Sequence, residues 1–129
     1  MSFIALATRR YAEVVDFYGT ALGFPAVRSW DRPRGRGCVF DLGGLKLEIL
    51  DALREQAPQQ LGDPGERVNV VVEVDDLDAM RSRLPIATPE PFATSWGARL
   101  FSLRDPDGIP VWFLQWIEPV DGNDSASSA

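Results

Sequence analysis

Histidine is missing from all 129 residues of this chain, and that absence excludes several kinds of chemistry. A serine–histidine–aspartate triad, a cysteine–histidine pair and a histidine metal site all need an imidazole, so none can form within the chain. A metal site made only of carboxylates or thiolates needs a cluster of such residues, and the sequence contains none. We therefore expect no metal and no other cofactor, and we assign no catalytic residue.

Cysteine and long apolar segments are also scarce. Cys38 is the only cysteine, which excludes an internal disulfide and favours a reducing compartment, so the cytoplasm is the expected location. No run approaches the roughly 20 apolar residues that span a bilayer, and residues 1–4 do not begin a secretory signal. The net charge of −6 repels nucleic-acid phosphates and anionic membranes, so neither is an expected partner, and it mildly favours cationic ligands.

Positive charge is carried almost entirely by arginine, because Lys46 is the only lysine. Four arginines lie close together, interleaved with Pro33, Gly35 and Gly37: Arg28, Arg32, Arg34 and Arg36. Proline and glycine at these positions favour a solvated hairpin loop. A nucleic-acid surface is the weaker interpretation, because no basic face or series of stacking aromatic residues extends the cluster.

The apolar pattern of the first half predicts a βαβββ unit. A strand at residues 3–7 precedes a helix whose apolar stripe runs from Tyr11 to Leu22 and which ends at Gly23. Three β-rich runs follow, at residues 26–30, 38–42 and 45–50. Gly43-Gly44 joins the last two runs as a two-residue hairpin turn.

The second half repeats this order. A strand at residues 68–74 is followed by Asp76, a good N-cap for a short helix that Pro85 ends. An extended proline-rich stretch, a strand at 99–103, a type I turn at 105–108 and an apolar run at 109–117 complete the unit. We expect one domain at residues 1–118, with modules 1–55 and 66–118, a bridge at 56–67 and a disordered tail at 119–129.

The predicted fold class is α+β, with the two modules forming a cupped mixed, mostly antiparallel sheet and the helices on its convex face. Alternation along a strand assigns each residue to one face of the sheet. The residues expected to face a helix are Val111 and Phe113 on the last strand, Leu47 and Ile49 on the fourth, and Val70 and Val72 on the fifth. The opposite, concave face is expected to carry Pro110, Trp112, Leu114, Trp116, Lys46, Glu48, Leu50, Asn69, Val71 and Glu73.

Two motifs give the chain a family resemblance. The segment Phe17-Tyr18-Gly19-Thr20-Ala21-Leu22-Gly23-Phe24 is similar to the F-Y-x-x-x-L-G-F helix end of the vicinal-oxygen-chelate superfamily of glyoxalases, extradiol dioxygenases and bleomycin resistance proteins. Trp96-Gly97 followed by Phe101 to Gly108 resembles the W-G…F-x-L-R-D-P-x-G segment, closest to the bleomycin resistance proteins. Together with the repeat, the resemblance covers about residues 2 to 118.

This resemblance implies the fold but not the metal chemistry of the enzymes in the superfamily. Their four ligand positions fall on Phe3, Glu48, Asn69 and Trp112, of which only Glu48 matches. One carboxylate cannot hold a transition metal against water, and phenylalanine and tryptophan offer no donor. The resemblance further implies a homodimer that holds a small molecule in grooves between subunits.

We expect the concave face to bind a small molecule through aromatic and acidic side chains. The candidate ligand-binding residues are Phe3, Trp30, Glu48, Leu50, Asn69, Glu73, Trp96, Arg99, Trp112, Leu114 and Trp116. Each candidate also has an alternative to ligand binding. Each tryptophan could instead pack in the core or in a dimer interface. The two glutamates could form ion pairs with Lys46, Arg99 or another arginine, and Arg99 could be structural or solvated.

Three functions remain open on the sequence. The first is metal-independent binding of an amphipathic or aromatic, possibly cationic molecule, as in antibiotic-sequestering bleomycin resistance proteins. The second is a metal-free enzyme of the same superfamily in which Glu48 or Glu73 is a general base; no nucleophile–base spacing favours it. The third is a dimerising partner domain without a ligand.

Overall fold

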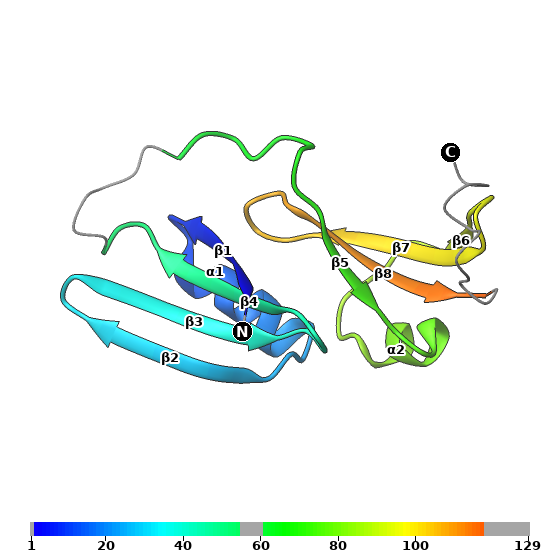
Figure 1. Cartoon of the computed structure of the whole chain (residues 1–129), viewed down its shortest axis with the longest axis horizontal. Helices are drawn as coiled ribbons and strands as arrows, with labels where there is room; N and C mark the ends of the chain where they lie inside the picture. The colour runs from blue at the N-terminus through cyan, green and yellow to red at the C-terminus, as the bar shows by residue number, and fades with distance from the viewer. Residues whose placement is uncertain (1, 55–60, 118–129) are drawn as a thin grey trace. The chain divides into compact units, whose positions relative to one another are not determined.

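The computed structural model describes residues 2–54 and 61–117. Within these ranges the chain forms an α+β fold with two four-stranded mixed sheets (Figure 1). The strands divide into two compact units, one reaching to Val68 and including Asp105–Ile109, the other holding Asn69–Arg104 and the residues from Pro110 onward. The element order confirms the predicted repeat of a βαβββ module, with a separate sheet for each module.

The first unit places one helical segment against one face of its sheet. Its elements are β1 (Phe3–Thr8), α1 (Tyr11–Asp16), the π-helix η1 (Phe17–Ala21), β2 (Ala26–Arg32), β3 (Gly35–Asp41) and β4 (Lys46–Asp51). The strand order is β1-β4-β3-β2, with β1 parallel to β4 and the other pairs antiparallel. The helical segment contributes Val14 and Tyr18 to the core, against Phe40, Leu47 and Ile49 of the sheet.

The predicted single helix of the first unit changes its winding after Asp16. The N–H of Leu22 donates to the carbonyl oxygen of Phe17, 2.9 Å away, a spacing of five residues instead of four. Gly19 sits in this wider turn, where an added Cβ would lie 3.1 Å from Cε1 of Phe40. The helix therefore approaches the sheet too closely at Gly19 for a larger residue without movement of that ring. Gly23, with φ of +77°, ends the segment as predicted.

The predicted hairpin at the four arginines is present and Arg28, Arg32 and Arg34 are exposed, but its loop is shorter than predicted. Strands β2 and β3 continue to the pair Arg32–Gly35, so only Pro33 and Arg34 form the turn. Arg28 and Arg36 lie on the strands, where their guanidinium groups stack on aromatic rings: Arg28 on Trp30 at 5.3 Å and Arg36 on Tyr11 at 4.4 Å from the ring centroid. Cross-strand pairing extends the hairpin because a two-residue turn satisfies more backbone groups than a loop.

The second unit repeats the same plan. Its elements are β5 (Val70–Glu73), α2 (Leu77–Arg83), β6 (Phe92–Ala93), β7 (Ala98–Arg104) and β8 (Pro110–Trp116), with strand order β5-β8-β7-β6. Asp76 caps α2 as predicted, its Oδ1 accepting from the N–H of Ala79 at 3.0 Å. Leu77 is fully buried, and the rings of Phe101 and Phe113 stack with centroids 5.3 Å apart on the helix-facing side.

Alternation along the strands is confirmed in both units. Leu47, Ile49, Val111 and Phe113 are fully buried, whereas Lys46, Glu48, Leu50 and Trp112 between them are half-buried. No helix in the described ranges is long and apolar enough to cross a bilayer. The predicted tail at 119–129 lies outside the described residues, as does the first part of the predicted bridge; residues 61–67 of the bridge carry no helix or strand.

The turn Asp105–Gly108, between β7 and β8, belongs to the first unit, where Tyr18 binds it. The Tyr18 hydroxyl is buried and donates to Oδ2 of Asp105 at 2.8 Å. The other carboxylate oxygen accepts from the N–H groups of Asp107 and Ile109, both at 2.9 Å. The N–H of Gly108 donates to the Asp105 carbonyl at 2.9 Å, as a type I turn requires.

Burial dominates the protonation of this pair. Desolvation raises the pKa of Asp105 above its ordinary value, and the hydrogen bonds from Ile109, Tyr18 and Asp107 offset that rise only in part. Desolvation, followed by the nearby Asp105 charge, raises the pKa of Tyr18 far above its ordinary value. Tyr18 therefore stays a hydrogen-bond donor at every physiological pH.

We predict that Tyr18→Phe lowers the free energy of unfolding by about 1–3 kcal/mol at neutral pH, because a buried carboxylate loses a donor. The pKa of Asp105 is higher in the folded chain than in the unfolded chain. Its contribution to the free energy of unfolding is therefore greatest at a pH below its pKa in the unfolded chain, and it declines as the pH rises through its pKa in the folded chain. Removing a donor that favours the carboxylate raises that pKa further. The loss in the variant should therefore shrink in a more acidic buffer, because a larger fraction of Asp105 is protonated there. Urea denaturation at both pH values measures it.

Tyr11→Phe is the matched control for this measurement. It removes the same atom from a buried tyrosine whose hydroxyl has no hydrogen-bond partner within residues 2–54 and 61–117. Its stability should change little and with no difference between the two buffers. An equal loss for Tyr18→Phe at both pH values would contradict the assigned role of the Asp105 charge.

Candidate functional site

The sheet face opposite α2 brings together most of the predicted ligand-binding residues of the second unit. Parallel pairing of β5 with β8 sets Val71 beside Trp112 and Glu73 beside Leu114. Antiparallel pairing of β7 with β8 sets Leu100 beside Leu114. Partners in register point to the same face of a sheet, so these side chains share one surface.

Trp112 is held in a defined orientation on this face. Its Nε1–H donates to Oδ1 of Asn69 at 3.0 Å, and the ring of Phe92 meets it edge-on with centroids 6.3 Å apart. Below the indole lies a buried cluster of Ala98, Leu100 and Leu114, against which Trp112 packs. Leu114 is only 7% exposed, so it supports the indole and offers little surface of its own. The indole itself remains half-buried.

A second aromatic pair extends the same surface. The rings of Trp96 and Trp116 meet edge to face, with centroids 5.5 Å apart. The exposed fractions are 53% for Phe92, 48% for Val71, 43% for Trp96 and 38% for Trp116. We call Val71, Phe92, Trp96, Trp112 and Trp116 the aromatic face. Large apolar side chains gathered in this way on a protein surface mark a place where something else binds.

Phe92 is the residue that sequence reasoning missed on this face. It lies on the two-residue strand β6, within a stretch that its prolines indicated only as extended. The pairing of Phe92 with Leu100 on β7 assigns it to the face of Leu114 and Trp112. Two residues are too short for a period to show in the sequence, so only the pairing could reveal it.

Glu73 supplies the acidic group of this surface. It is exposed and lies beside Leu114, and no ion pair to it exists among the described residues. Arg99, by contrast, is paired with Gln115 on β7 and β8 and so faces α2, away from the aromatic face. Its guanidinium donates to both carboxylate oxygens of Asp78, at 3.2 and 3.3 Å, and thereby lowers the pKa of Asp78. Arg99 therefore has a structural contact with α2, which was the alternative to ligand binding for this residue.

The remaining predicted residues lie on the face of the first sheet opposite α1. Register places Ala5 beside Glu48 and Ala7 beside Leu50, and Phe3 is 53% exposed at the start of β1. Glu48 is half-buried and has no ion pair within the described parts of the chain. Ion pairing with Lys46 or an arginine was the alternative to ligand binding for Glu48 and Glu73. Neither glutamate forms such a pair with a described residue.

Trp30 covers the backbone of the neighbouring strand. A Cβ added to Gly37 would lie 2.2 Å from Cζ2 of Trp30, so the indole rests directly on the glycine. Arg28 stacks on the indole at 5.3 Å. The ring is thus enclosed between its own strand's arginine and β3, and only part of it is available to other molecules.

Comparison with known proteins gives a family and several solved folds. The model of the Glyoxalase/Bleomycin resistance protein/Dioxygenase superfamily matches residues 1–113, while no curated protein matches the sequence. A glyoxalase/bleomycin resistance protein/dioxygenase from Nocardioides is similar, with 25% identity and a TM-score of 0.67 over 95% of this chain and 87% of that one.

Two further solved structures share the fold and carry different descriptions. TnmS3, an antibiotic binding protein from a Streptomyces species, has 22% identity and a TM-score of 0.64, covering 90% of this chain and 97% of that one. Lactoylglutathione lyase from Agrobacterium tumefaciens has 20% identity and a TM-score of 0.65, covering 89% and 92%. At these identities the likeness concerns the fold alone.

The four positions that the resemblance assigns to metal ligands do not fit a metal. The side chain of Phe3 has no donor atom, and Trp112 has only an N–H that Asn69 already accepts. The Asn69 amide oxygen accepts that N–H and is a neutral, weak ligand, so Glu48 is the one anionic donor of the set. No group of three or more cysteine, aspartate or glutamate residues suited to a metal occurs within the described part of the chain.

We predict that the purified protein holds no stoichiometric transition metal, because its donors at these positions cannot compete with water for one. Elemental analysis after dialysis measures the metal content directly, with the Glu48→Gln variant as a control for adventitious binding to the one matching carboxylate. About one zinc, iron, manganese or nickel ion per chain would contradict the prediction.

Proposed function

This chain belongs to the Glyoxalase/Bleomycin resistance protein/Dioxygenase superfamily, and we propose that within it the protein binds a flat aromatic or amphipathic small molecule without the help of a metal. The observation that carries the proposal is the aromatic face, an indole fixed in orientation and flanked by exposed apolar side chains. A fixed ring loses little conformational freedom when a ligand stacks on it, so more of the stacking energy contributes to affinity.

A preference for cationic ligands follows from the charges at this surface. Glu73 lies on the same face, is exposed and has no ion pair among the described residues. Aromatic ring faces attract cations as well, and the chain as a whole carries a net charge of −6. A ligand that presents a ring to Trp112 and a positive group to Glu73 would use both features.

Sequestration of such a molecule is the role that fits this surface best. The fold is shared with an antibiotic binding protein as well as with a lyase, so the fold by itself does not choose between them. The donor set at Phe3, Glu48, Asn69 and Trp112, which does not suit a metal, supports binding over metal-assisted turnover, and antibiotic resistance by sequestration is the corresponding biological role. Cys38, a buried free thiol, is compatible with a cytoplasmic setting.

We predict that Trp112→Ala weakens the binding of a planar aromatic ligand by about 1–3 kcal/mol, mainly through lost apolar contact with the ring. Fluorescence titration with aminoacridine, a planar cation, measures the affinity, and recovery of the unchanged compound separates binding from turnover. Glu73→Gln should weaken aminoacridine about two- to fivefold, since the carboxylate is exposed, and should leave the anionic acridine carboxylate unaffected or improved.

Glu13→Gln is the matched charge control, because it removes the same charge from an exposed position of α1. Its affinity for both compounds should equal that of the parent protein. A Trp112→Ala protein that folds normally and binds aminoacridine as tightly as the parent would show that Trp112 only packs. Equal losses for Glu73→Gln and Glu13→Gln would reduce the role of Glu73 to net charge.

We also propose that the protein is a two-fold homodimer, because apolar residues as exposed as Phe92 and Trp96 are seldom gathered on the surface of a monomer. Light scattering at micromolar concentration should give about twice the 14.3 kDa mass of one chain. The double variant Phe92→Ser with Trp96→Ser should shift the mass toward that of one chain. A parent protein with the mass of one chain would contradict the proposal.

A further inference from the structure

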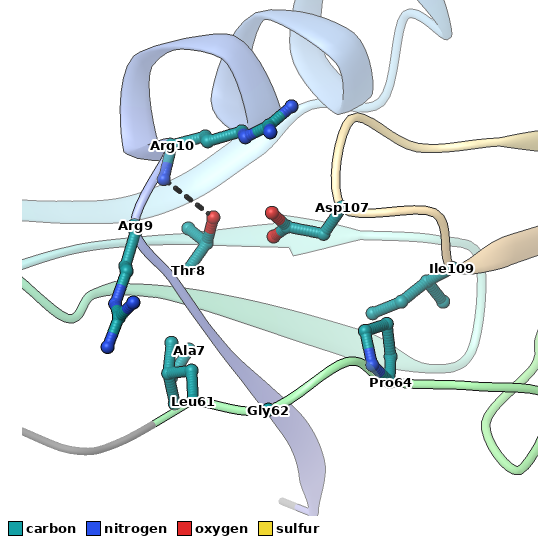
Figure 2. Close-up of a pocket in the computed structure, with 9 residues that line it drawn as sticks. All are labelled: Ala7, Thr8, Arg9, Arg10, Leu61, Gly62, Pro64, Asp107 and Ile109. Atoms are coloured by element: carbon teal, nitrogen blue, oxygen red, sulfur yellow. Dashed lines mark hydrogen bonds between the residues drawn. The ribbon is translucent and has the colours of Figure 1, made fainter.

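The first unit contains a cavity that the proposed ligand site does not use. It has a volume of about 320 Å³ and lies where the end of β1 meets the turn at Asp107 and the segment from Leu61 to Pro64 (Figure 2). A volume of roughly 300 Å³ is at the lower end of the range for small-molecule sites. All of its lining residues belong to the same compact unit. The cavity is therefore a site of its own, separate from the aromatic face.

Charged groups of both signs line this cavity without neutralising one another. Arg9, Arg10 and Asp107 all contribute to its wall. No salt bridge connects Asp107 to either arginine, and neither arginine has a carboxylate partner among the described residues. In Figure 2 the Asp107 carboxylate points toward Thr8, while the Arg9 side chain extends toward Ala7 and Leu61. A positive and a negative group are thus separately available to one ligand.

Hydrogen bonds position Arg10, Thr8 and the backbone of Asp107, and they leave the charged groups without an ionic partner. Nη1 of Arg10 donates to the carbonyl oxygen of Pro106 at 3.2 Å, which ties the guanidinium to the turn that carries Asp107. The backbone N–H of Asp107 donates to Oδ1 of Asp105 at 2.9 Å. Oγ1 of the buried Thr8 accepts from the backbone N–H of Arg10 at 2.9 Å, so its own hydroxyl hydrogen can still be donated.

Apolar side chains form the rest of the wall. Figure 2 shows Pro64 and Ile109 on one side of the cavity and Ala7 with Leu61 on the other. Such surfaces suit the hydrocarbon part of a small ligand. The combination of a guanidinium, a carboxylate and an apolar wall matches a molecule that carries an anionic group, a cationic group and a short apolar body.

We propose that this cavity binds a small zwitterion of the amino-acid or dipeptide class. Its carboxylate pairs with the guanidinium of Arg9, its ammonium group pairs with Asp107, and its apolar side chain lies against Leu61, Pro64 and Ile109. Both charges of the ligand are needed, because an anion alone leaves Asp107 unpaired and a cation alone leaves the two arginines unpaired.

The test is a titration of the isotope-labelled full chain followed by amide NMR signals. The probes are L-leucine, L-methionine, L-phenylalanine and the dipeptide leucyl-leucine at millimolar concentration. At least one should shift the amide signals of Thr8, Arg10 and Asp107. Two analogues of that probe then remove one charge each: the carboxamide lacks the carboxylate, and the N-acetyl derivative lacks the ammonium group. Each should bind about tenfold more weakly, the effect of losing one charged hydrogen bond.

Variants of the chain make the same distinction from the protein side. Arg9→Gln and Asp107→Asn should each weaken binding of the probe about tenfold, because each removes one charged partner of the ligand. Both variants should fold normally, because neither side chain has a hydrogen bond among the described residues. Arg34→Gln, at the tip of the β2–β3 turn, is the matched control and should bind as the parent does. The Trp112→Ala variant should also bind the probe normally, which keeps this site distinguishable from the aromatic face.

Several results would overturn the proposal. The absence of amide shifts at the cavity with all four probes would do so, as would equal affinity for the probe and both of its analogues. Unchanged binding by Arg9→Gln and Asp107→Asn would place the ligand elsewhere. None of these outcomes bears on the aromatic face, whose test uses other compounds and other residues.

Discussion

The hydrogen bond from Tyr18 to Asp105 is the contact on which the arrangement of the first unit depends. Tyr18 belongs to the F-Y motif at the end of the first helix, and Asp105 belongs to the D-P-D-G motif 87 positions later. The two motifs that carry the family resemblance therefore meet at one buried point. Asp105 in turn holds its own turn through two backbone N–H groups, and this places Asp107 and Ile109 at the wall of the cavity. The resemblance is thus explained by structure and requires no shared catalysis.

The sequence predicts aromatic stacking and charge in one groove, whereas the structure has an aromatic face and a separate charged cavity. The aromatic face owes its character to alternation along β8, which sends Trp112 and Trp116 to the side opposite Val111 and Phe113. The charges of the cavity come from the loop at Arg9 and Arg10 and from the turn at Asp107, and neither segment has a period. Stacking dominates the first and charge the second, so the two surfaces suit different classes of molecule.

What the sequence predicted well rests on regular structure, and what it missed rests on irregular or tertiary contacts. The faces of Glu48, Glu73 and Trp112 follow from a period of two, which any strand imposes. The partners of Arg99 and Arg28 could not be predicted, because ion pairing with α2 and stacking on Trp30 depend on how elements pack. The charged cavity was likewise missed, since its residues are adjacent only in the folded chain.

The central claim, that the aromatic face receives the ligand, is tested most directly by the indole N–H signals of the four tryptophans during a titration with aminoacridine. Replacing each tryptophan in turn by phenylalanine assigns the four signals. We expect the signals of Trp112, Trp96 and Trp116 to shift, because these rings lie on the face opposite α2. We expect a smaller effect at Trp30, which Arg28 covers. A shift of the Trp30 signal alone, with the other three unmoved by a bound ligand, would contradict the claim.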